Sequence, residues 1–371
     1  MIYLDYAADT PVAEKVLEAF CDATKTYIAN PNAHHTLGKS AKGRIEEVAQ
    51  EIATYFHITK EEVIFTSGAT ESNNLAIKGI ATNRRRYGKH MITSYLEHSS
   101  VTGPMSALAQ EGYEIDYVDI LPNGQIDLEH LKELLREDTI LVSVCAVDSE
   151  LGIKQPIAEI AQILSEYTNC VFHVDATQAI GKIPFSMEGI DLVTFTPHKF
   201  NGLHGCGVLL KKQGVRIDPL IHGGVSTTIF RSGTPTVALI VALEVAFKLH
   251  ISQMEQHFAY VTRLNQILRE AFSKNPKVMV NSPEEAVPFI INISIKDQKA
   301  VVVQEMLAEK EIFISTKSAC TTLNTPSRSV MAMTKDRKRA MATLRISLSH
   351  LTTEEEVHTF IAAFNEIMET E

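Results

Sequence analysis

The chain has 371 residues, of which 45% are hydrophobic and 22% are charged. This composition is ordinary for a globular protein and excludes collagenous, low-complexity and wholly disordered chains, while the length fits two unequal domains. The formal net charge of -10 argues against a surface that coats nucleic acid, so we expect no direct nucleic-acid binding.

Apolar residues between Arg44 and Phe56 recur at spacings of three and four, which predicts an amphipathic helix. Short apolar runs rich in β-branched residues follow, and helical patterns separate most of them. Such alternation predicts a mainly parallel sheet with helices on both faces, because parallel strands need long crossovers. The expected strands are Val63–Phe65, Met91–Tyr95, Ile115–Ile120, Thr139–Val147, Cys170–Val174, Leu192–Phe195 and Val208–Leu210.

The pattern changes after Pro235, where a long helical stretch begins. The segment from Thr352 to Glu356 has the capping-box pattern that begins a last helix. These elements predict a second, smaller α+β domain. Its expected strands are Phe289–Ile295, Ile312–Ser315 and Leu344–Leu348.

A hydroxyl-rich turn from Thr66 to Ser72 follows the first expected strand and opens a helix. Ligands of parallel sheets bind at the carboxyl ends of strands, and a helix start offers free backbone N–H groups to an anion. The turn is therefore a candidate phosphate site, although such a turn is more often only a helix cap. It lacks the P-loop ending and the three-glycine spacing of a dinucleotide site, which argues against ATP and NAD.

Three reactive side chains stand at the ends of other expected strands, namely His98, Asp175 and Lys199. Each has an ordinary structural explanation when it is taken alone. Together with the phosphate turn they match the needs of pyridoxal 5'-phosphate, whose aldehyde forms a Schiff base with lysine and whose ring nitrogen needs an acidic partner. Zinc is a weaker hypothesis, because only His204 and Cys206 show a short ligand spacing, and we expect no metal site.

The five cysteines are too scattered for a disulfide framework, which favours a reducing compartment. We find no signal peptide pattern and no run of about 18 apolar residues, so we expect a cytoplasmic protein without a membrane segment. Cys320 enters a polar segment after a short strand and is the best candidate for a reactive thiol. The others are expected to be small core residues: Cys21, Cys145, Cys170 and Cys206.

Seven motifs stand in one order along nearly the whole chain: Tyr3–Ala8, Thr66–Asn74, Glu97–His98, His173–Gln178, His198–Lys199, Arg231–Thr234 and Ser318–Thr321. With them the sequence resembles the cysteine desulfurases of the NifS/IscS type, within the class V aminotransferase family of pyridoxal-phosphate enzymes. The resemblance implies the type I fold of pyridoxal-phosphate-dependent transferases, an α/β fold whose seven-stranded, mainly parallel sheet has helices on both faces. We expect a large cofactor-binding domain at residues 15–250. A small α+β domain with the catalytic cysteine would comprise residues 1–14 and 251–371.

The resemblance also implies roles for individual residues. Lys199 would bind the cofactor covalently, Asp175 would pair with its ring nitrogen, and His98 would stack on the ring and move protons. Arg345, helped by Asn30, would bind the substrate carboxylate. The remaining cofactor contacts would be Ser149 and Gln178 at the phenolic oxygen, Ala69, Thr70, Thr196 and His198 at the phosphate, and Thr234 from the other subunit of a homodimer.

The implied substrate is free L-cysteine. Cys320, as thiolate, would attack the substrate sulfur, which leaves a persulfide on Cys320 and releases L-alanine. The sulfur would pass to an acceptor protein, either an iron-sulfur scaffold or a tRNA-thiolating enzyme.

Several positions depart from the family pattern. Asp148-Ser149 replaces a pair of asparagines, Val225 to Phe230 replaces a glycine-rich stretch, and Ser349-His350 replaces Gly-Arg. Gly202 to Gly205 likewise replaces Gly-Pro-Lys-Gly. Two alternatives therefore stay open, namely another class V enzyme such as an aminotransferase or a selenocysteine lyase-like enzyme, and a non-catalytic homologue that binds a partner.

Overall fold

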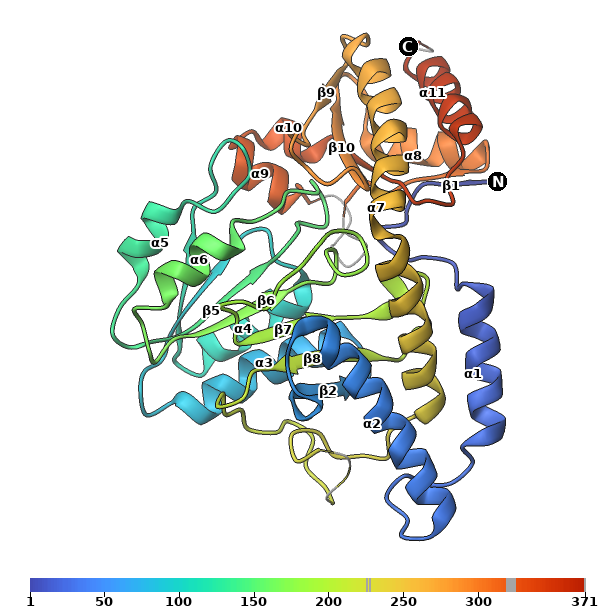
Figure 1. Ribbon diagram of the computed structural model, residues 1–371. Helices are drawn as coiled ribbons and strands as arrows, with labels where there is room; N and C mark the ends of the chain where they lie inside the picture. Colours follow the sequence, from blue (N-terminus) through green and yellow to red (C-terminus); the bar gives the residue numbers. More distant parts are fainter. Residues whose placement is uncertain (225, 227, 318–324, 370–371) are drawn as a thin grey trace.

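The computed structural model describes residues 1–224, 226, 228–317 and 325–369. A seven-stranded sheet forms its centre, in the order β2-β8-β7-β6-β5-β3-β4 (Figure 1). Only β8 runs antiparallel to its neighbours, so the expected mainly parallel sheet is confirmed. The strands are β2 (Val63–Thr66), β3 (His90–Ser94), β4 (Glu114–Val118), β5 (Thr139–Cys145), β6 (Val171–Asp175), β7 (Leu192–Phe195) and β8 (Gly207–Lys211).

Helices cover both faces of this sheet, because successive strand residues point to opposite sides. On β8, Leu209 belongs to one hydrophobic cluster, which includes α3 (Ala69–Arg84) and α4 (Ser99–Gln110). The adjacent residues Val208 and Leu210 belong to a second hydrophobic cluster. That second cluster includes apolar residues of α1 (Glu14–Thr26), α2 (Thr36–Phe56), α5 (Leu128–Leu134), α6 (Ile157–Leu164) and α7 (Val237–Ser273).

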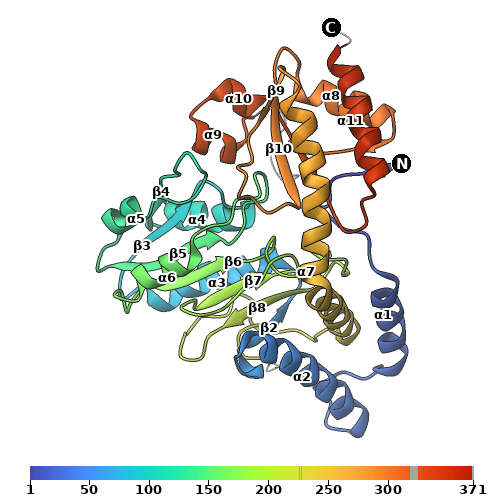
Figure 2. The same ribbon diagram turned by 45° about the horizontal axis from the view of Figure 1, so that its top comes forward.

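The C-terminal part is built around a small antiparallel sheet, in the order β12-β10-β9. The N-terminal β1 (Ile2–Tyr3) pairs with β11 (Ile312–Phe313), so both ends of the chain lie at this part of the molecule (Figure 2). The second α+β region is thus observed, whereas the exact division of the chain stays a prediction. Its other elements are β9 (Val278–Val280), β10 (Ile290–Ile295), β12 (Thr343–Ser347), α8 (Ala300–Glu309), α9 (Arg328–Thr334), α10 (Arg337–Met341) and α11 (Glu354–Glu369).

Helix α7 has 37 residues and reaches from the central sheet to the small one (Figure 1). It is the one helix of the described residues that is long and apolar enough to cross a membrane, by length and composition only. No run of about 18 apolar residues is expected from the sequence. In the fold, α7 packs against α1, α2 and α11, as a core helix does.

Three of the four cysteines that were expected in the core are buried, namely Cys145, Cys170 and Cys206. The expectation is wrong for Cys21, which is exposed on α1. This helix buries Val16 and Ala23, and Cys21 lies outside that narrow stripe.

Candidate active site

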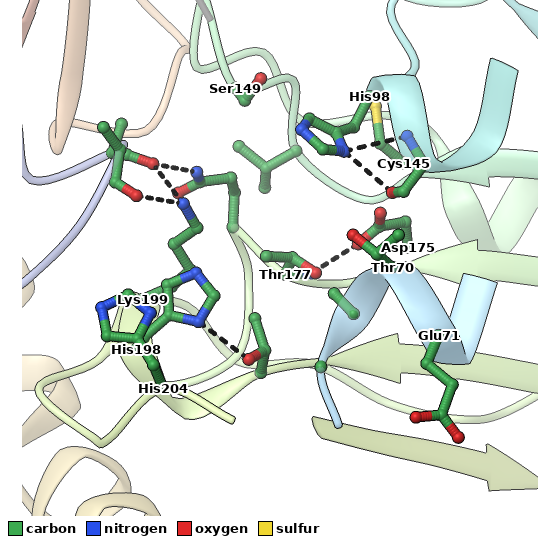
Figure 3. A pocket seen from close by; sticks show the side chains of 18 of the residues that line it. Thr70, Glu71, His98, Cys145, Ser149, Asp175, Thr177, His198, Lys199 and His204 are labelled. Atoms are coloured by element: carbon green, nitrogen blue, oxygen red, sulfur yellow. Dashed lines mark hydrogen bonds between the residues drawn. The ribbon is translucent and has the colours of Figure 1, made fainter. Parts of the chain in front are cut away.

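A cavity of about 400 Å³ lies at the carboxyl ends of the central strands (Figure 3). This is where ligands of open α/β sheets bind. The cavity brings together side chains from β6, β12, η2 (Pro197–Lys199) and the starts of α3 and α4. The site residues expected from the sequence that line it are Ala69, Thr70, His98, Ser149, Asp175, Gln178, Thr196, His198, Lys199 and Arg345.

Asp175 ends β6 and is almost fully buried. Its Oδ2 accepts a hydrogen bond from Nδ2 of Asn73 at 2.7 Å, and its Oδ1 accepts one from the backbone N–H of Thr177 at 3.0 Å. These two donors stabilise a carboxylate that has lost most of its water. The arrangement presents an acceptor to a cationic N–H in the cavity.

Lys199 belongs to the short helix η2 that follows β7. Its Nζ donates to the carbonyl oxygens of Ala7 at 3.1 Å and Ala8 at 2.5 Å. These carbonyls come from the N-terminal segment, which therefore forms one wall of the cavity. In Figure 3 the lysine nitrogen points to these carbonyls, and His98 and Asp175 lie across the cavity from it.

The anion end of the cavity is formed by the start of α3, where Ser67, Gly68, Ala69 and Thr70 line the wall. A helix start offers unpaired backbone N–H groups and a positive partial charge to a phosphate. A Cβ at Gly207 would lie 2.5 Å from the carbonyl carbon of Gly68, so only glycine lets β8 approach this turn.

His198 lies beside the anion end of the cavity, and its hydrogen bonds show which of its ring nitrogens carries the proton. The Thr196 hydroxyl donates to the Cys206 carbonyl at 2.9 Å, so its oxygen accepts from Nδ1 of His198 at 3.0 Å. Burial, followed by the charge of Lys199, lowers the pKa of His198 to about 4. The ring is therefore neutral near pH 7 and can donate only through Nδ1.

His98 precedes α4, and its Nδ1 accepts from the backbone N–H of Ser100 at 3.2 Å. The Ser100 hydroxyl accepts from Nδ2 of Asn73, so it donates its own proton to the same Nδ1 at 2.8 Å. Burial lowers the pKa of His98, and the charges of Lys199 and Arg328 act in the same direction. The neutral ring thus carries its proton on Nε2.

Glu97 precedes His98 in one of the seven motifs, but the sequence assigned it no role. Its Oε1 accepts from the Ser94 hydroxyl and from the backbone N–H of Cys145, at 2.7 and 3.0 Å. Burial raises the pKa of Glu97 to about 8. The carboxyl is therefore mainly protonated at neutral pH, which avoids an unpaired charge beneath the site.

Arg345 reaches the cavity from β12 and is almost fully buried. Its guanidinium donates to Oδ1 of Asp5 at 2.8 Å and to the Ser149 carbonyl at 2.9 Å. Its Nε is buried and has no hydrogen-bond partner among the described residues. The guanidinium lines the cavity, where a carboxylate can accept hydrogen bonds from it.

These groups fit pyridoxal 5'-phosphate. The start of α3 suits its phosphate, the Lys199 amine suits its aldehyde, and the Asp175 carboxylate suits its protonated ring nitrogen. The described residues include no group of three or more His, Cys, Asp or Glu side chains that could hold a metal ion.

The family described as aminotransferase class-V matches residues 2–360. The chain belongs to the class-V aminotransferase family. It is 39% identical to a protein named cysteine desulfurase IscS from Neisseria meningitidis serogroup C, over 96% of this chain and 89% of the relative. The resemblance, the fold type and the cofactor expected from the sequence are therefore confirmed, and this class-V enzyme uses pyridoxal 5'-phosphate.

Two solved structures resemble this class-V enzyme over nearly all of its length. A NifS-like protein has a TM-score of 0.93 at 32% identity and covers 100% of both chains. A structure titled SspA in complex with cysteine has a TM-score of 0.82 at 32% identity, over 95% of this chain and 100% of the other.

Two of the expected site residues that the structure describes do not line the cavity of this single chain. Asn30 and Thr234 are exposed and form a hydrogen bond of 3.5 Å with each other. Cys320 lies outside the described residues, as do Val225 and Thr227 of the altered stretch.

The cavity also contains residues that sequence reasoning missed. His204 stacks on His198, with ring centroids 4.7 Å apart, and its Nε2 donates to Oδ2 of Asp9 at 2.9 Å. Cys145 lines the wall, although it was expected to be only a core residue. Because Cys145 ends β5, the rule that sites gather at strand ends could have identified it.

Proposed function

We propose that this enzyme is a cysteine desulfurase that converts L-cysteine to L-alanine and moves the sulfur to Cys320 as a persulfide. The observation that carries the proposal is the gathering of Lys199, Asp175 and Arg345 around one cavity. Relatives named cysteine desulfurase, and the structure of SspA with cysteine, support L-cysteine as the substrate.

Bound pyridoxal 5'-phosphate supplies an electron sink for the pair released at the substrate α-carbon. Asp175 keeps this sink effective because its carboxylate accepts the N–H of the ring nitrogen. Asn73 and Thr177 hold the carboxylate in place through the two hydrogen bonds described above. They keep it correctly oriented.

Two residues are placed to move protons. Once the Nζ of Lys199 is released from the cofactor, it would take the proton from the substrate α-carbon. His98 holds a proton on Nε2, since its Nδ1 is already an acceptor from Ser100. It can therefore donate this proton to the departing product or to the substrate.

Arg345 orients the substrate. Its guanidinium lines the cavity, and each terminal nitrogen keeps a second N–H for the substrate carboxylate while the first stays bound to Asp5 or Ser149. The substrate thus meets a guanidinium that the protein already holds in one orientation.

The sulfur step involves Cys320. A lone pair of its thiolate forms a bond to the substrate sulfur as the carbon–sulfur bond breaks, and the released pair is protonated at the β-carbon to give L-alanine. Ser315, which precedes Cys320 in the chain, lies beside the cavity, because Ser315 and Arg345 form two backbone hydrogen bonds with each other, at 2.6 and 3.2 Å. Lys317 and Thr325 are the described residues on either side of the segment 318–324, which contains Cys320. They are linked by hydrogen bonds of 2.7 Å.

We propose further that the enzyme is a cytoplasmic homodimer. It would transfer its sulfur to an acceptor protein, either an iron-sulfur scaffold or a tRNA-thiolating enzyme. The exposure of Thr234 and Asn30 supports the dimer, since Thr234 is free to reach the cavity of a second copy. The IscS name of relatives supports sulfur delivery.

The test is to incubate the holoenzyme with L-cysteine and to measure alanine and protein-bound persulfide. We expect Cys320→Ala to lose the persulfide and nearly all alanine formation, because burial raises the pKa of the Cys145 thiol, which also lines the cavity, and so keeps it from attacking as a thiolate. Cys21→Ala is the matched control, since Cys21 is an exposed thiol on α1, and it should retain both. Equal alanine release by Cys320→Ala would refute the role of Cys320, and amino transfer to a 2-oxo acid would indicate an aminotransferase instead.

A further inference from the structure

Lys182 is a buried lysine that the chemistry above does not use. Its side chain is 9% exposed, and its Nζ donates to Oε1 of Gln178 at 2.6 Å. Among the described residues no carboxylate forms an ion pair with it. A buried lysine without a counter-ion is costly, so its position calls for an explanation.

The surroundings of Lys182 are cationic. It lines a small cavity behind the active site together with Lys199 and His250, and no acidic side chain lines that cavity. Burial, followed by the charges of Lys199 and Arg345, lowers the pKa of Lys182 to about 7, and Lys182 in turn helps to lower the pKa of His198. Attraction to an acid therefore does not explain why a lysine stands here.

The contact with Gln178 offers the explanation. The Lys182 nitrogen has N–H groups in both its protonation states, and it donates one of them to the amide oxygen, Oε1. The Ala7 carbonyl can only accept, and it faces the amide nitrogen, Nε2, at 2.9 Å. Both contacts select the same one of the two amide orientations, and Nε2 keeps a second N–H for an acceptor in the cavity.

We propose that Lys182 is a positioning residue, which fixes the Gln178 amide so that its nitrogen donates to the phenolic oxygen of the cofactor. This inference rests on the proposed function and on the contact of Gln178 with the phenolic oxygen that the resemblance to cysteine desulfurases implies. Lys182 itself does not line the active-site cavity, so it acts through Gln178.

The hydrogen bond between Lys182 and Gln178 is especially important in this chain. Ser149 stands where the family pattern has an asparagine, and its hydroxyl reaches less far into the cavity than an amide would. Gln178 is then the longer of the two donors to the phenolic oxygen, and a reversed amide would present an oxygen to an oxygen. Lys182 prevents that reversal.

A double-mutant cycle on the holoenzyme tests the proposal, with Lys182→Met, Gln178→Met and the two changes combined. The readout is the pH at which the visible absorbance of the Lys199-bound cofactor changes. A donated N–H stabilises negative charge on the phenolic oxygen, so its loss favours the protonated form of the Lys199–cofactor nitrogen. We expect each single change to raise the midpoint by about one pH unit, a tenfold change in the proton equilibrium.

The combined variant should shift no further than Gln178→Met alone, because Lys182 acts through Gln178. An unchanged midpoint in Lys182→Met would overturn the proposal. So would a combined shift equal to the sum of the two, since Lys182 would then act by its charge alone.

The matched control is Lys211→Met, which removes another buried lysine that donates to a carbonyl, that of Val215, outside the cavity. It should leave the midpoint unchanged. Thermal unfolding of the cofactor-free variants shows whether each of them folds. Alanine formation by the unaltered enzyme is measured separately, so a failure of the desulfurase assignment is distinguishable from a failure of the role of Lys182.

Discussion

Arg345 and Asp5 form a pair that prepares the site for a carboxylate. Asp5 balances the charge of the buried guanidinium before substrate is present, which lowers the cost of burying it. The Ser149 carbonyl accepts from the other terminal nitrogen of Arg345, so the directions of the remaining N–H groups of the guanidinium are set in advance. A planar, rigid donor group is needed for this, and arginine provides it whereas lysine does not.

We therefore expect Arg345→Lys to raise the KM for L-cysteine at least about tenfold, because a lysine held by Asp5 has no further N–H in the fixed direction. Steady-state kinetics of alanine formation measure this change. The absorbance of the bound cofactor serves as a control and should stay the same. An unaltered KM would show that the substrate carboxylate binds elsewhere.

At the scale of elements, the turn after β5 is tied to helix α9. Asp148 is fully buried, and its Oδ2 accepts from the backbone N–H groups of Glu150 at 3.1 Å and Leu151 at 2.5 Å, while its Oδ1 accepts from the Ser329 hydroxyl at 2.9 Å. Glu150 accepts from the hydroxyl of Ser327, which caps α9. Asp148 thus joins two elements instead of facing the cofactor, and Ser149 alone faces the cavity.

Asp148→Ala should lower the free energy of unfolding by about 3 kcal/mol, because it leaves two buried N–H groups and one hydroxyl without an acceptor. Ser329→Ala removes only one of these bonds and should cost about 1 kcal/mol. Urea unfolding of the cofactor-free protein measures both changes. Asp22→Ala, an exposed position on α1, is the control, and a loss as small as that of the control would contradict this role.

At the scale of the whole molecule, a group of histidines joins α7 to the segment after β12. The rings of His257 and His350 are stacked with centroids 3.9 Å apart, and His250 lies 5.5 and 5.4 Å from them. Burial, then the neighbouring histidines, lowers the pKa of His250 to about 3 and that of His350 to about 4. His250 and His350 are therefore neutral in the folded protein near pH 6.

This group should make the protein sensitive to acid. In the unfolded chain His250 and His350 take up protons near pH 6.5, whereas the folded protein binds these protons only near pH 3 to 4, so stability is lost as the pH falls from about 6.5 to 4. His350→Phe keeps a ring on His257 but removes one titrating group. Its unfolding free energy should fall less steeply over this range, by at most about 1.4 kcal/mol per pH unit.

Urea unfolding at several pH values between 4 and 7 measures this difference. The comparison with the unaltered protein cancels the contribution of other titrating groups. Identical slopes for the two proteins would show that His350 does not contribute to acid sensitivity.

Much of the fold could be predicted from the sequence, because strands and helices follow from residues that are neighbours in the chain. All seven expected strands of the central sheet are present, and the expected capping box forms between Thr353 and Glu356. Lys199, Asp175 and His98 could be identified for the same reason: each follows a recognisable strand, and strand ends meet at one edge of a parallel sheet.

The partners of these residues were decided only by the tertiary structure. Asp5 and Arg345 are 340 positions apart, and Asp148 and Ser329 are 181 apart, so no local pattern connects them. Lys182 and Gln178 are close in sequence, but their bond has a purpose only because the Ala7 carbonyl meets the other end of the amide. The sequence alone determined which groups stand at the strand ends, whereas packing of the N-terminal segment, β12 and α9 against the sheet decided how each is held, because hydrogen bonds depend on distance in space.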